Sequence, residues 1–423
     1  MRIKITNGML ICPTVQSPKV SNILIDAGKF IDECNASDFK ADITIDAKNK
    51  WILPSLVDLK GCVHLPGASI QYDNGIKELT AYEKTGFSHA LCFPNQSHCF
   101  DKSTTIHKLI HSPNPITLMP VGALTVGNLG EQLNDYQTLQ QAGCMAFSSG
   151  LKSIQNLIIL RSAYELLASF GLLVIICPQE STLSHNGCAH EGKIATRLGL
   201  KPIPRMAETV SLVQHLSLIE ATGVKAHFTG LTSYESIEII HHYKNKGLNI
   251  TCDVAIANLH LTDLDIGEFN SLYHVNPPLR STEDLLGLKK GLVDGTIDAI
   301  TSHHCALTPL HKLAPFEETV PGMSIIDSFL KLCLKSHQDL SSAHTISLNQ
   351  WIAKFTFNPL KILGLSGGTL QSGQPANLII VDPKHEHILD QSTFYANFKQ
   401  SPFDQWPFSH EISQIIFNGQ VLN

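Results

Sequence analysis

Short apolar runs rich in β-formers alternate with helix-period segments through most of the chain, and this alternation constrains the fold more than any other feature. In the segments 153–169, 206–222 and 233–243, apolar side chains recur every three or four positions, as in amphipathic helices. Strands that alternate with helices indicate parallel pairing in an α/β fold. The strand-like runs number eight, at residues 56–59, 88–93, 116–121, 144–147, 172–177, 224–228, 248–254 and 297–301. Eight such units predict a (β/α)8 barrel over residues 51–365, with functional side chains at the C-terminal ends of its strands.

The two ends of the chain follow a different pattern, because they read as short strands joined by turns. Asn7-Gly8 is a hairpin turn signal between two β-rich runs. Near the other end, residues 377–382 form an apolar run typical of a buried strand. We therefore expect residues 1–50 and 366–423 to form one small β-domain together, outside the barrel.

Composition narrows the class of protein. Of the 423 residues, 43% are hydrophobic and 16% are charged, which provides enough apolar side chain for a large core. The net charge of −6 and the lack of a basic stripe argue against nucleic acid as a partner. No apolar run is long enough to span a bilayer, so no membrane partner is expected. The 11 cysteines are scattered without a C-x-x-C pair, a usage typical of reduced, cytoplasmic proteins.

Several short motifs, in order along the chain, resemble one enzyme family. They are the strand start at 51–59, the Cys-Phe-Pro-Asn turn at 92–95, the Val-Asn-Pro-Pro-Leu-Arg segment at 275–280, and two C-terminal motifs at 358–365 and 373–378. Together they resemble the dihydroorotases of the amidohydrolase superfamily, and the resemblance covers nearly the whole chain. It implies a TIM-type barrel of this superfamily that hydrolyses a cyclic amide with the help of divalent zinc.

The residues that would hold zinc in such an enzyme are replaced here. The resemblance places the metal ligands at positions occupied in this chain by Lys60, Cys62, Ser149, Cys177, Gly230 and His303. A lysine ammonium repels a divalent cation, and glycine has no side chain to offer as a ligand. Two substrate-contacting positions of the family are also changed, to His64 and Leu307. We therefore predict degenerate catalytic positions, with no bound metal and no other cofactor. Asp58, in the first strand, is expected to stabilise the barrel instead of acting as an acid or base.

What remains of the family's site is Asn95 and Asn276, which we predict to be relics of ligand binding. A chain that keeps the scaffold without the metal ligands is predicted to be catalytically inactive. The family includes a non-catalytic dihydroorotase-like chain that forms a heterododecamer with aspartate carbamoyltransferase. The resemblance therefore implies a structural role in pyrimidine biosynthesis, with the catalytic chain of aspartate carbamoyltransferase as the partner.

Two other functions stay open at this level. The first is an active cyclic-amide hydrolase with a rebuilt zinc site drawn from Cys62, His64, Cys177, His227, His303 and His304. Adjacent strand residues point to opposite faces, so His303 and His304 are not expected to reach one ion together. His227 is expected to be a hydrogen-bonded core or loop histidine. The second function is a sensor that binds dihydroorotate or carbamoyl-aspartate through Asn95 and Asn276 without turnover.

Overall fold

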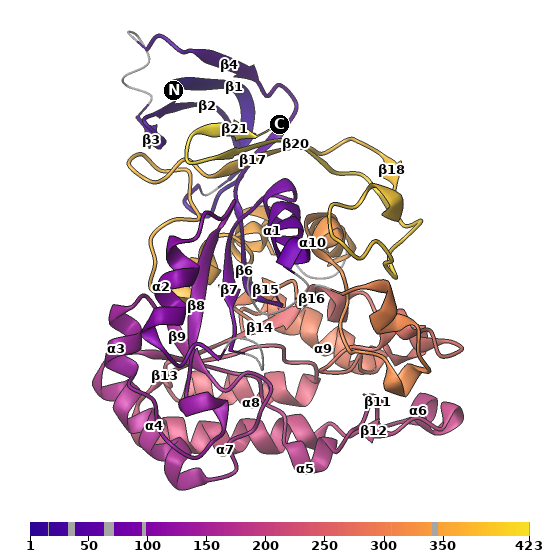
Figure 1. Cartoon of the computed structure of the whole chain (residues 1–423). Helices are drawn as coiled ribbons and strands as arrows, with labels where there is room; N and C mark the ends of the chain where they lie inside the picture. Colours follow the sequence, from indigo (N-terminus) through magenta and orange to yellow (C-terminus); the bar gives the residue numbers. More distant parts are fainter. Residues whose placement is uncertain are drawn as a thin grey trace.

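The computed structural model describes residues 1–15, 17–32, 39–62, 72–94, 99–305, 307–340 and 346–422, apart from the side chains of Cys62 and of residues 72–76. In this part of the chain, helices surround a barrel of parallel strands, and strands from both termini form a separate sheet (Figure 1). The barrel confirms the predicted fold class. No helix within the described ranges is both long enough and apolar enough to cross a membrane.

The barrel wall, as far as the chain is described, consists of eight parallel strands in chain order. These are β6 (Leu56–Cys62), β7 (Phe87–Cys92), β8 (Thr117–Ala123), β9 (Ala146–Ser148), β10 (Leu173–Ile176), β13 (Lys225–Phe228), β14 (Ile250–Ala255) and β15 (Ala299–Thr301). All eight overlap the runs that the sequence predicts. After two intervening residues, the short strand β16 (His304–Cys305) pairs in parallel with β6, with His304 opposite Gly61. This pairing closes the ring between the first and last strands.

Helices connect the strands on the outside of the barrel (Figure 1). Three of them lie where the sequence predicts helices: α4 (Leu157–Ser169), α7 (Met206–Thr222) and α8 (Tyr234–Asn245). Two of the barrel helices start at polar capping residues. Ser233 caps α8, and Ser281 forms a capping box at the start of the next helix. The other described helices and the short strands among them are α1 (Tyr72–Lys84), α2 (Ser103–His111), α3 (Tyr136–Gln141), α5 (Ser181–Ser184), β11 (Ala189–His190), α6 (Lys193–Leu198), β12 (Pro202–Ile203), α9 (Thr282–Val293), α10 (Ile326–Leu340), α11 (Leu348–Ala353) and α12 (Phe357–Ile362).

A second sheet is built from both ends of the chain. Its strands are β1 (Ile3–Leu10), β2 (Lys19–Asp26), β3 (Lys29–Ile31), β4 (Ile43–Asp46), β5 (Trp51–Pro54), β17 (Leu378–Asp382), β20 (Glu411–Phe417) and β21 (Gln420–Leu422). The hairpin β18 (His387–Ile388) and β19 (Pro407–Phe408) lies between β17 and β20 in the chain. Strand β5 follows the expected boundary at residue 50 and pairs with β1 and β17. The terminal sheet therefore extends to Pro54, and Ser55 leads directly into the barrel.

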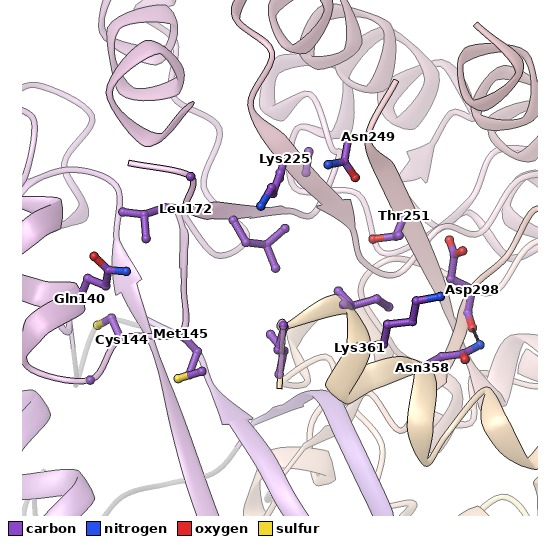
Figure 2. Close-up of a pocket in the computed structure, with 17 residues that line it drawn as sticks. Gln140, Cys144, Met145, Leu172, Lys225, Asn249, Thr251, Asp298, Asn358 and Lys361 are labelled. Carbon is purple, nitrogen blue, oxygen red and sulfur yellow. Dashed lines mark hydrogen bonds between the residues drawn. The ribbon is translucent and has the colours of Figure 1, made fainter. Parts of the chain in front are cut away.

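The N-terminal end of the barrel is covered by α12. Leu360 and Leu363 pack into the barrel interior against the apolar side chains of the strands. Beside this helix, a pocket of about 720 Å³ lies where the strands begin, with Leu172 before β10 and Lys225 at the start of β13 (Figure 2). In barrels of this kind, functional side chains gather at the opposite end, where the strands finish. The candidate site is therefore described from the C-terminal ends of the strands.

Candidate functional site

The positions singled out from the sequence meet at the C-terminal end of the barrel. Lys60 lies in β6, Ser149 directly follows β9, and Cys177 directly follows β10. Gly230 comes shortly after β13, and His303 lies between β15 and β16. A cavity of about 440 Å³ opens here, lined among others by Lys60, Lys152, Ser149, Asn276 and His303. The side chain of Cys62, and all of His64 and Asn95, lie outside the described residues.

The Lys60 ammonium group faces this cavity. Its Nζ lies 3.8 Å from the centroid of the Phe93 ring, a cation–π contact. Close to it, burial raises the pKa of the Cys177 thiol to about 11, although the Lys60 charge acts in the opposite direction. Cys177 is therefore a neutral thiol near neutral pH, whereas zinc binds the thiolate. A cation and a neutral thiol occupy two of the positions that the resemblance assigns to metal-binding histidines.

Gly230 and His303 fit against each other. Gly230 has a φ of +72°, and a Cβ added there would lie 3.0 Å from His303 Nε2 and closer still to Cε1. His303 also has a positive φ, of 48°. The imidazole thus fills the space that any side chain at position 230 would need. Gly230 and His303, at the positions where the resemblance implies a histidine and an aspartate, are therefore sterically complementary.

The His303 imidazole is neutral. Burial lowers its pKa to about 4; Asp253 opposes this shift, and Lys60 adds to it. Its Nε2 lies 3.9 Å from Asp253 Oδ1, beyond hydrogen-bonding distance, and is buried without a hydrogen-bond partner. At neutral pH this side chain carries no charge, whereas the aspartate that the resemblance implies at this position carries a negative charge.

Asp253, in β14, was not identified from the sequence. The carboxylate is fully buried and accepts hydrogen bonds from His227 Nε2 (2.9 Å) and from the backbone N–H of Gly230 (2.8 Å). Burial raises its pKa, but the hydrogen bond and charge of His227 outweigh that effect and the pKa is lowered overall. His227 Nδ1 lies 2.9 Å from Thr251 Oγ1. His227 is therefore the hydrogen-bonded core histidine expected from the sequence. A lone carboxylate within the apolar run 248–254 is the signal that identifies Asp253.

His304, in β16, contacts a different set of residues from His303, which precedes the strand. Its Nε2 pairs with Glu78 Oε1 from α1, and its Nδ1 accepts a hydrogen bond from Ile325 N at 3.2 Å. Burial alone lowers the pKa of His304, but the charge and hydrogen bond of Glu78 raise it overall. Asn397 donates to the same carboxylate from its backbone N–H and its side chain. His304 is thus held in a buried ion pair that links the barrel closure to the C-terminal segment.

The Glu78–His304 pair predicts a pH-dependent contribution to stability. Because the pKa of His304 is raised above 6.5, its contribution is complete below pH 6.5 and is lost as the pH rises through the folded-state value. Because the pKa of Glu78 is lowered below 4.5, its contribution is lost as the pH falls through that lower value. We expect Glu78→Gln to lower the free energy of unfolding by about 3 kcal/mol near pH 5.5.

Urea denaturation of the wild type and Glu78→Gln across the pH range measures this contribution. The difference in the free energy of unfolding between the two proteins should be largest between pH 4.5 and 6.5. It should shrink as the pH rises above this range. Glu386→Gln, at an exposed carboxylate outside the barrel, serves as the control and should change little at any pH. A difference that stays constant with pH would mean that the two residues are not an ion pair.

Asp58 joins the first and last strands of the barrel. The carboxylate is fully buried and accepts hydrogen bonds from Ser302 N (3.0 Å), Ser302 Oγ (2.5 Å) and Tyr82 Oη (3.1 Å). These contacts lie beside the β6–β16 pairing that closes the ring. Asp58 therefore has the stabilising role expected from the sequence.

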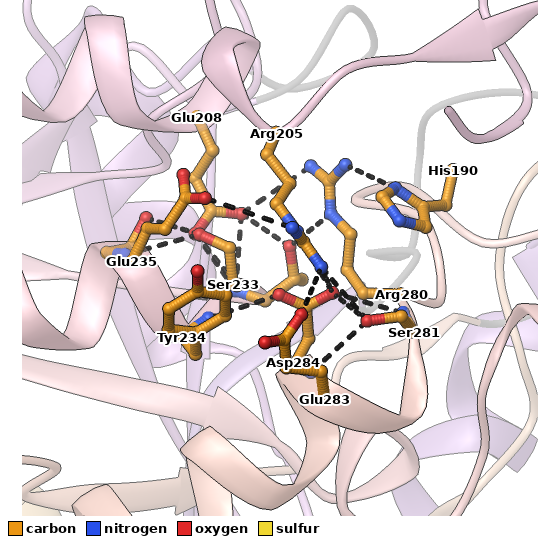
Figure 3. A network of polar contacts seen from close by, with 12 residues as sticks. His190, Arg205, Glu208, Ser233, Tyr234, Glu235, Arg280, Ser281, Glu283 and Asp284 are labelled. Carbon is orange, nitrogen blue, oxygen red and sulfur yellow. Dashed lines mark hydrogen bonds and ion pairs between the residues drawn. The ribbon is translucent and has the colours of Figure 1, made fainter. Parts of the chain in front are cut away.

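Arg280, the last residue of the 275–280 motif, belongs to a buried polar network (Figure 3). Its guanidinium donates to Ile203 O (2.9 Å), Thr232 Oγ1 (3.0 Å) and His190 Nδ1 (3.2 Å). Glu208, at the start of α7, accepts from the backbone N–H of Thr232 at 3.1 Å. The network connects the segment between β10 and α7, which contains β11 and β12, to the segment that follows β13. Arg280 thus has a structural role, while Asn276 of the same motif lines the cavity.

Comparison with known proteins gives the family. A model described as "Dihydro-orotase-like" matches residues 49–236, and one described as "Amidohydrolase family" matches residues 183–422. A "Dihydroorotase-like protein" of Pseudomonas aeruginosa is 36% identical, over 95% of this chain and 95% of its own length. This chain belongs to the dihydroorotase-like amidohydrolases. A "Dihydroorotase" of Desulforapulum autotrophicum is 32% identical, over 90% of this chain and 88% of its own length.

Solved structures of amidohydrolases share the fold of this dihydroorotase-like chain. A D-hydantoinase structure matches with a TM-score of 0.83 and 19% identity, covering 100% of this chain and 95% of its own. The L-hydantoinase of Arthrobacter aurescens matches with a TM-score of 0.81 and 20% identity, covering 99% of this chain and 95% of its own. At this identity the likeness concerns the fold, a barrel with an attached β-domain.

The zinc site that the resemblance implies does not fit the side chains found here. Lys60 brings a positive charge, Gly230 has no side chain, and Cys177 holds its proton near neutral pH. The His303 ring packs over Gly230, in space that a ligand at position 230 would occupy. Within the described ranges, no three His, Cys, Asp or Glu side chains converge to hold a metal ion.

Proposed function

We propose that this chain is a non-catalytic dihydroorotase-like protein. The packing of the His303 ring over Gly230 is the observation that carries the proposal, because the ring fills the space that a ligand side chain at position 230 would need. Hydrolysis of a cyclic amide near neutral pH needs a metal-activated water and a carboxylate that accepts its proton. Here the position that the resemblance assigns to that carboxylate holds a neutral imidazole without its negative charge, and Lys60 brings a positive charge to the site.

Turnover in both directions, with dihydroorotate and with carbamoyl-aspartate, tests this proposal. The assays include added zinc, cobalt or manganese, and one of the relatives named "Dihydroorotase" serves as the positive control. We expect no turnover above the uncatalysed reaction under any of these conditions. Metal-dependent turnover that disappears in Cys62→Ala or His304→Ala would instead support the rebuilt Cys/His site of an active cyclic-amide hydrolase.

The proposed role of the inactive chain is structural: it assembles with the catalytic chain of aspartate carbamoyltransferase in pyrimidine biosynthesis. Two observations support this role. The barrel and the terminal sheet are complete in the described ranges although the metal-site positions have changed. The chain also resembles the non-catalytic partner of that transcarbamoylase, and this resemblance is the basis for proposing this partner and a heterododecameric complex.

Co-expression with the aspartate carbamoyltransferase chain of the same organism tests the assembly. Size-exclusion chromatography with light scattering should show one large complex that contains both chains, and transcarbamoylase activity should depend on it. Separate elution of two chains, with full transcarbamoylase activity in the absence of this protein, would contradict the structural role. That outcome would not affect the expectation that the chain has no dihydroorotase turnover. The two parts of the proposal, the lack of turnover and the structural role, are therefore tested independently.

A second candidate function is binding of a small ligand without turnover. Asn276 Oδ1 and His303 Nε2 are buried, lack hydrogen-bond partners and belong to residues that line the cavity at the barrel mouth. Thr229 Oγ1 and Gln179 Oε1, which follow β13 and β10, are also buried without partners. Buried polar atoms without partners are costly and are expected to meet water or a ligand. The amide oxygens of Asn276 and Gln179 accept hydrogen bonds and therefore favour a ligand with N–H groups, while Lys60 at the same cavity as Asn276 favours a carboxylate. Dihydroorotate and carbamoyl-aspartate carry both kinds of group.

Thermal unfolding with dihydroorotate or carbamoyl-aspartate tests this second candidate. Binding to the native state should raise the melting temperature with increasing ligand concentration. The rise should vanish in Asn276→Ala and persist in Asn245→Ala, which changes an exposed residue at the end of α8. An unchanged melting temperature at millimolar ligand would rule out the sensor.

A further inference from the structure

The interior of the barrel is polar along two neighbouring strands, β13 and β14. Apolar side chains from β6, β7, β8, β9, β10 and β15 fill the rest of the interior and pack with Leu360 and Leu363 of α12, as in most barrels of this kind. On β13 and β14, His227 and Asp253 are fully buried, and His227 bonds to both Asp253 and Thr251. We call Asp253, His227 and Thr251 the polar row. It runs from the barrel mouth towards the N-terminal end of the barrel.

The polar row leads into the pocket of about 720 Å³ at the N-terminal end of the barrel. Thr251 lines this pocket, and it lies opposite His227 in the register of the two strands. Lys225 and Asn249 precede His227 and Thr251 by two residues each, so they lie on the same faces of their strands. Both line the pocket as well. The side chains of Lys225 and Asn249 therefore extend the polar row to the end of the barrel axis.

Helix α12 brings a second lysine to this pocket. Lys361 follows Leu360, which packs into the barrel interior, and Lys361 itself lines the pocket. In the view of Figure 2, Thr251 lies between Lys225 and Lys361. Two ammonium groups, one from a strand and one from the helix that closes this end of the barrel, thus converge on one pocket.

The positive charge of the pocket is not balanced by the protein. In the described part of the chain, no carboxylate lies within 4 Å of the ammonium group of Lys225 or Lys361. Asp298 also lines the pocket, but its carboxylate pairs with Lys244 Nζ at 2.6 Å and accepts a hydrogen bond from Cys252 N at 2.8 Å. A hollow with two such cations attracts a negatively charged ligand.

The size and the other walls of the pocket suit an organic ligand. Its volume falls within the range of about 300–1,000 Å³ that is typical of sites for small molecules. Met145, Leu172 and Ile362 add apolar surface, which a bare inorganic ion would leave uncovered. The Thr251 hydroxyl can form more than one hydrogen bond, so the bond to His227 fixes its position and leaves capacity for a ligand.

We propose that the pocket at the N-terminal end of the barrel binds a small organic anion. Lys225 and Lys361 hold the carboxylate or phosphate group of the ligand, and Thr251 bonds to a polar group beside it. The apolar part of the ligand packs on Leu172 and Ile362. This inference goes beyond the proposed function and does not depend on it, because the pocket lies at the opposite end of the barrel from the mouth.

Isothermal titration calorimetry of the full chain tests the site with benzoate, phenyl phosphate and the uncharged benzamide. We expect saturable binding of at least one of the two anions and none of benzamide, and the tighter anion identifies the preferred acidic group. Lys225→Gln and Lys361→Gln should each weaken the binding about 10-fold. Lys19→Gln is the matched control, because Lys19 is an exposed lysine at the start of β2, as Lys225 is at the start of β13. Absence of saturable binding by both anions, or unchanged affinity in the two pocket variants, would overturn the proposal.

Acetylation of lysines in the wild-type protein gives a second readout that needs no variant. The chain is treated with an N-hydroxysuccinimide ester of acetic acid, with and without the anion that binds more tightly, and the modified lysines are identified by mass spectrometry. The bound anion should slow the acetylation of Lys225 and Lys361 and leave that of Lys19 unchanged. This protection should decrease as sodium chloride is added, because salt screens charges at an open pocket. Equal rates at Lys225 and Lys361 with and without the anion, or equal protection of Lys19, would contradict the site.

Discussion

Gly230→Ala is expected to lower the free energy of unfolding by about 3 kcal/mol. An alanine at φ +72° has left-handed backbone strain of about 1 kcal/mol. The added Cβ also comes within 3.0 Å of His303 Nε2, inside a packed interior, and such overpacking costs about 2 kcal/mol. This expectation follows from the contact between the His303 ring and Gly230, at a position that the resemblance assigns to a metal ligand. Urea denaturation of the single variant measures it.

A double-mutant cycle with His303→Ala separates the two causes. Without the imidazole, Gly230→Ala should cost only the backbone strain, so the coupling between the two positions is about 2 kcal/mol. Gly223→Ala is a matched control, since Gly223 also has a φ of +72° but has nothing within 4 Å of the added Cβ. It should cost about 1 kcal/mol. If Gly230→Ala and Gly223→Ala cost the same, the His303 ring does not occupy this space.

Asp253→Ala is expected to be more destabilising still, by about 4 kcal/mol. The substitution removes the acceptor of His227 Nε2 and of the Gly230 N–H, both buried. Each of these donors then lies in the interior without a partner, which costs more than the lost bonds alone. Urea denaturation near neutral pH measures the effect. Asp339→Ala, at an exposed carboxylate of α10, should change stability by less than about 0.5 kcal/mol.

The pH dependence of Asp253→Ala has a defined sign. Because the folded-state pKa of Asp253 is lowered below 3.8, its contribution is present above that pH and is lost as the pH falls through the folded-state value. The free energies of unfolding of the variant and the wild type should therefore differ most near neutral pH, and the difference should become smaller at acidic pH. A cost below about 1 kcal/mol near neutral pH would contradict the role of Asp253 as the anchor of His227 and Gly230.

The barrel could be predicted from the sequence because each of its strands is a short apolar run between helical segments. The alternation of apolar runs and helical segments does not indicate how the ring of strands closes. Strand β16 has only two residues, and beside its pairing with β6 Ser302 donates to Asp58, a contact between residues 244 positions apart in the sequence. Local periodicity carries no information on such a contact.

The candidate site was predictable by residue type but not by packing. The family resemblance placed Lys60, Gly230 and His303 at metal positions, and their chemistry argued against a metal. The resemblance could not predict that the His303 ring fills the space beside Gly230. This packing depends on two backbone segments that are far apart in the chain. Likewise, the Glu78 partner of His304 lies 226 residues away. Such pairs follow from the fold and not from any local signal.

The metal content of the purified chain tests the central claim most directly. The protein is incubated with excess zinc, dialysed, and measured by inductively coupled plasma mass spectrometry beside a relative named "Dihydroorotase" treated in the same way. Lys60, Gly230 and the packed His303 ring predict far less than one zinc per chain, while the relative retains its metal. About one zinc per chain, retained through dialysis and lost in His303→Ala, would contradict the account and identify a working metal site at the barrel mouth.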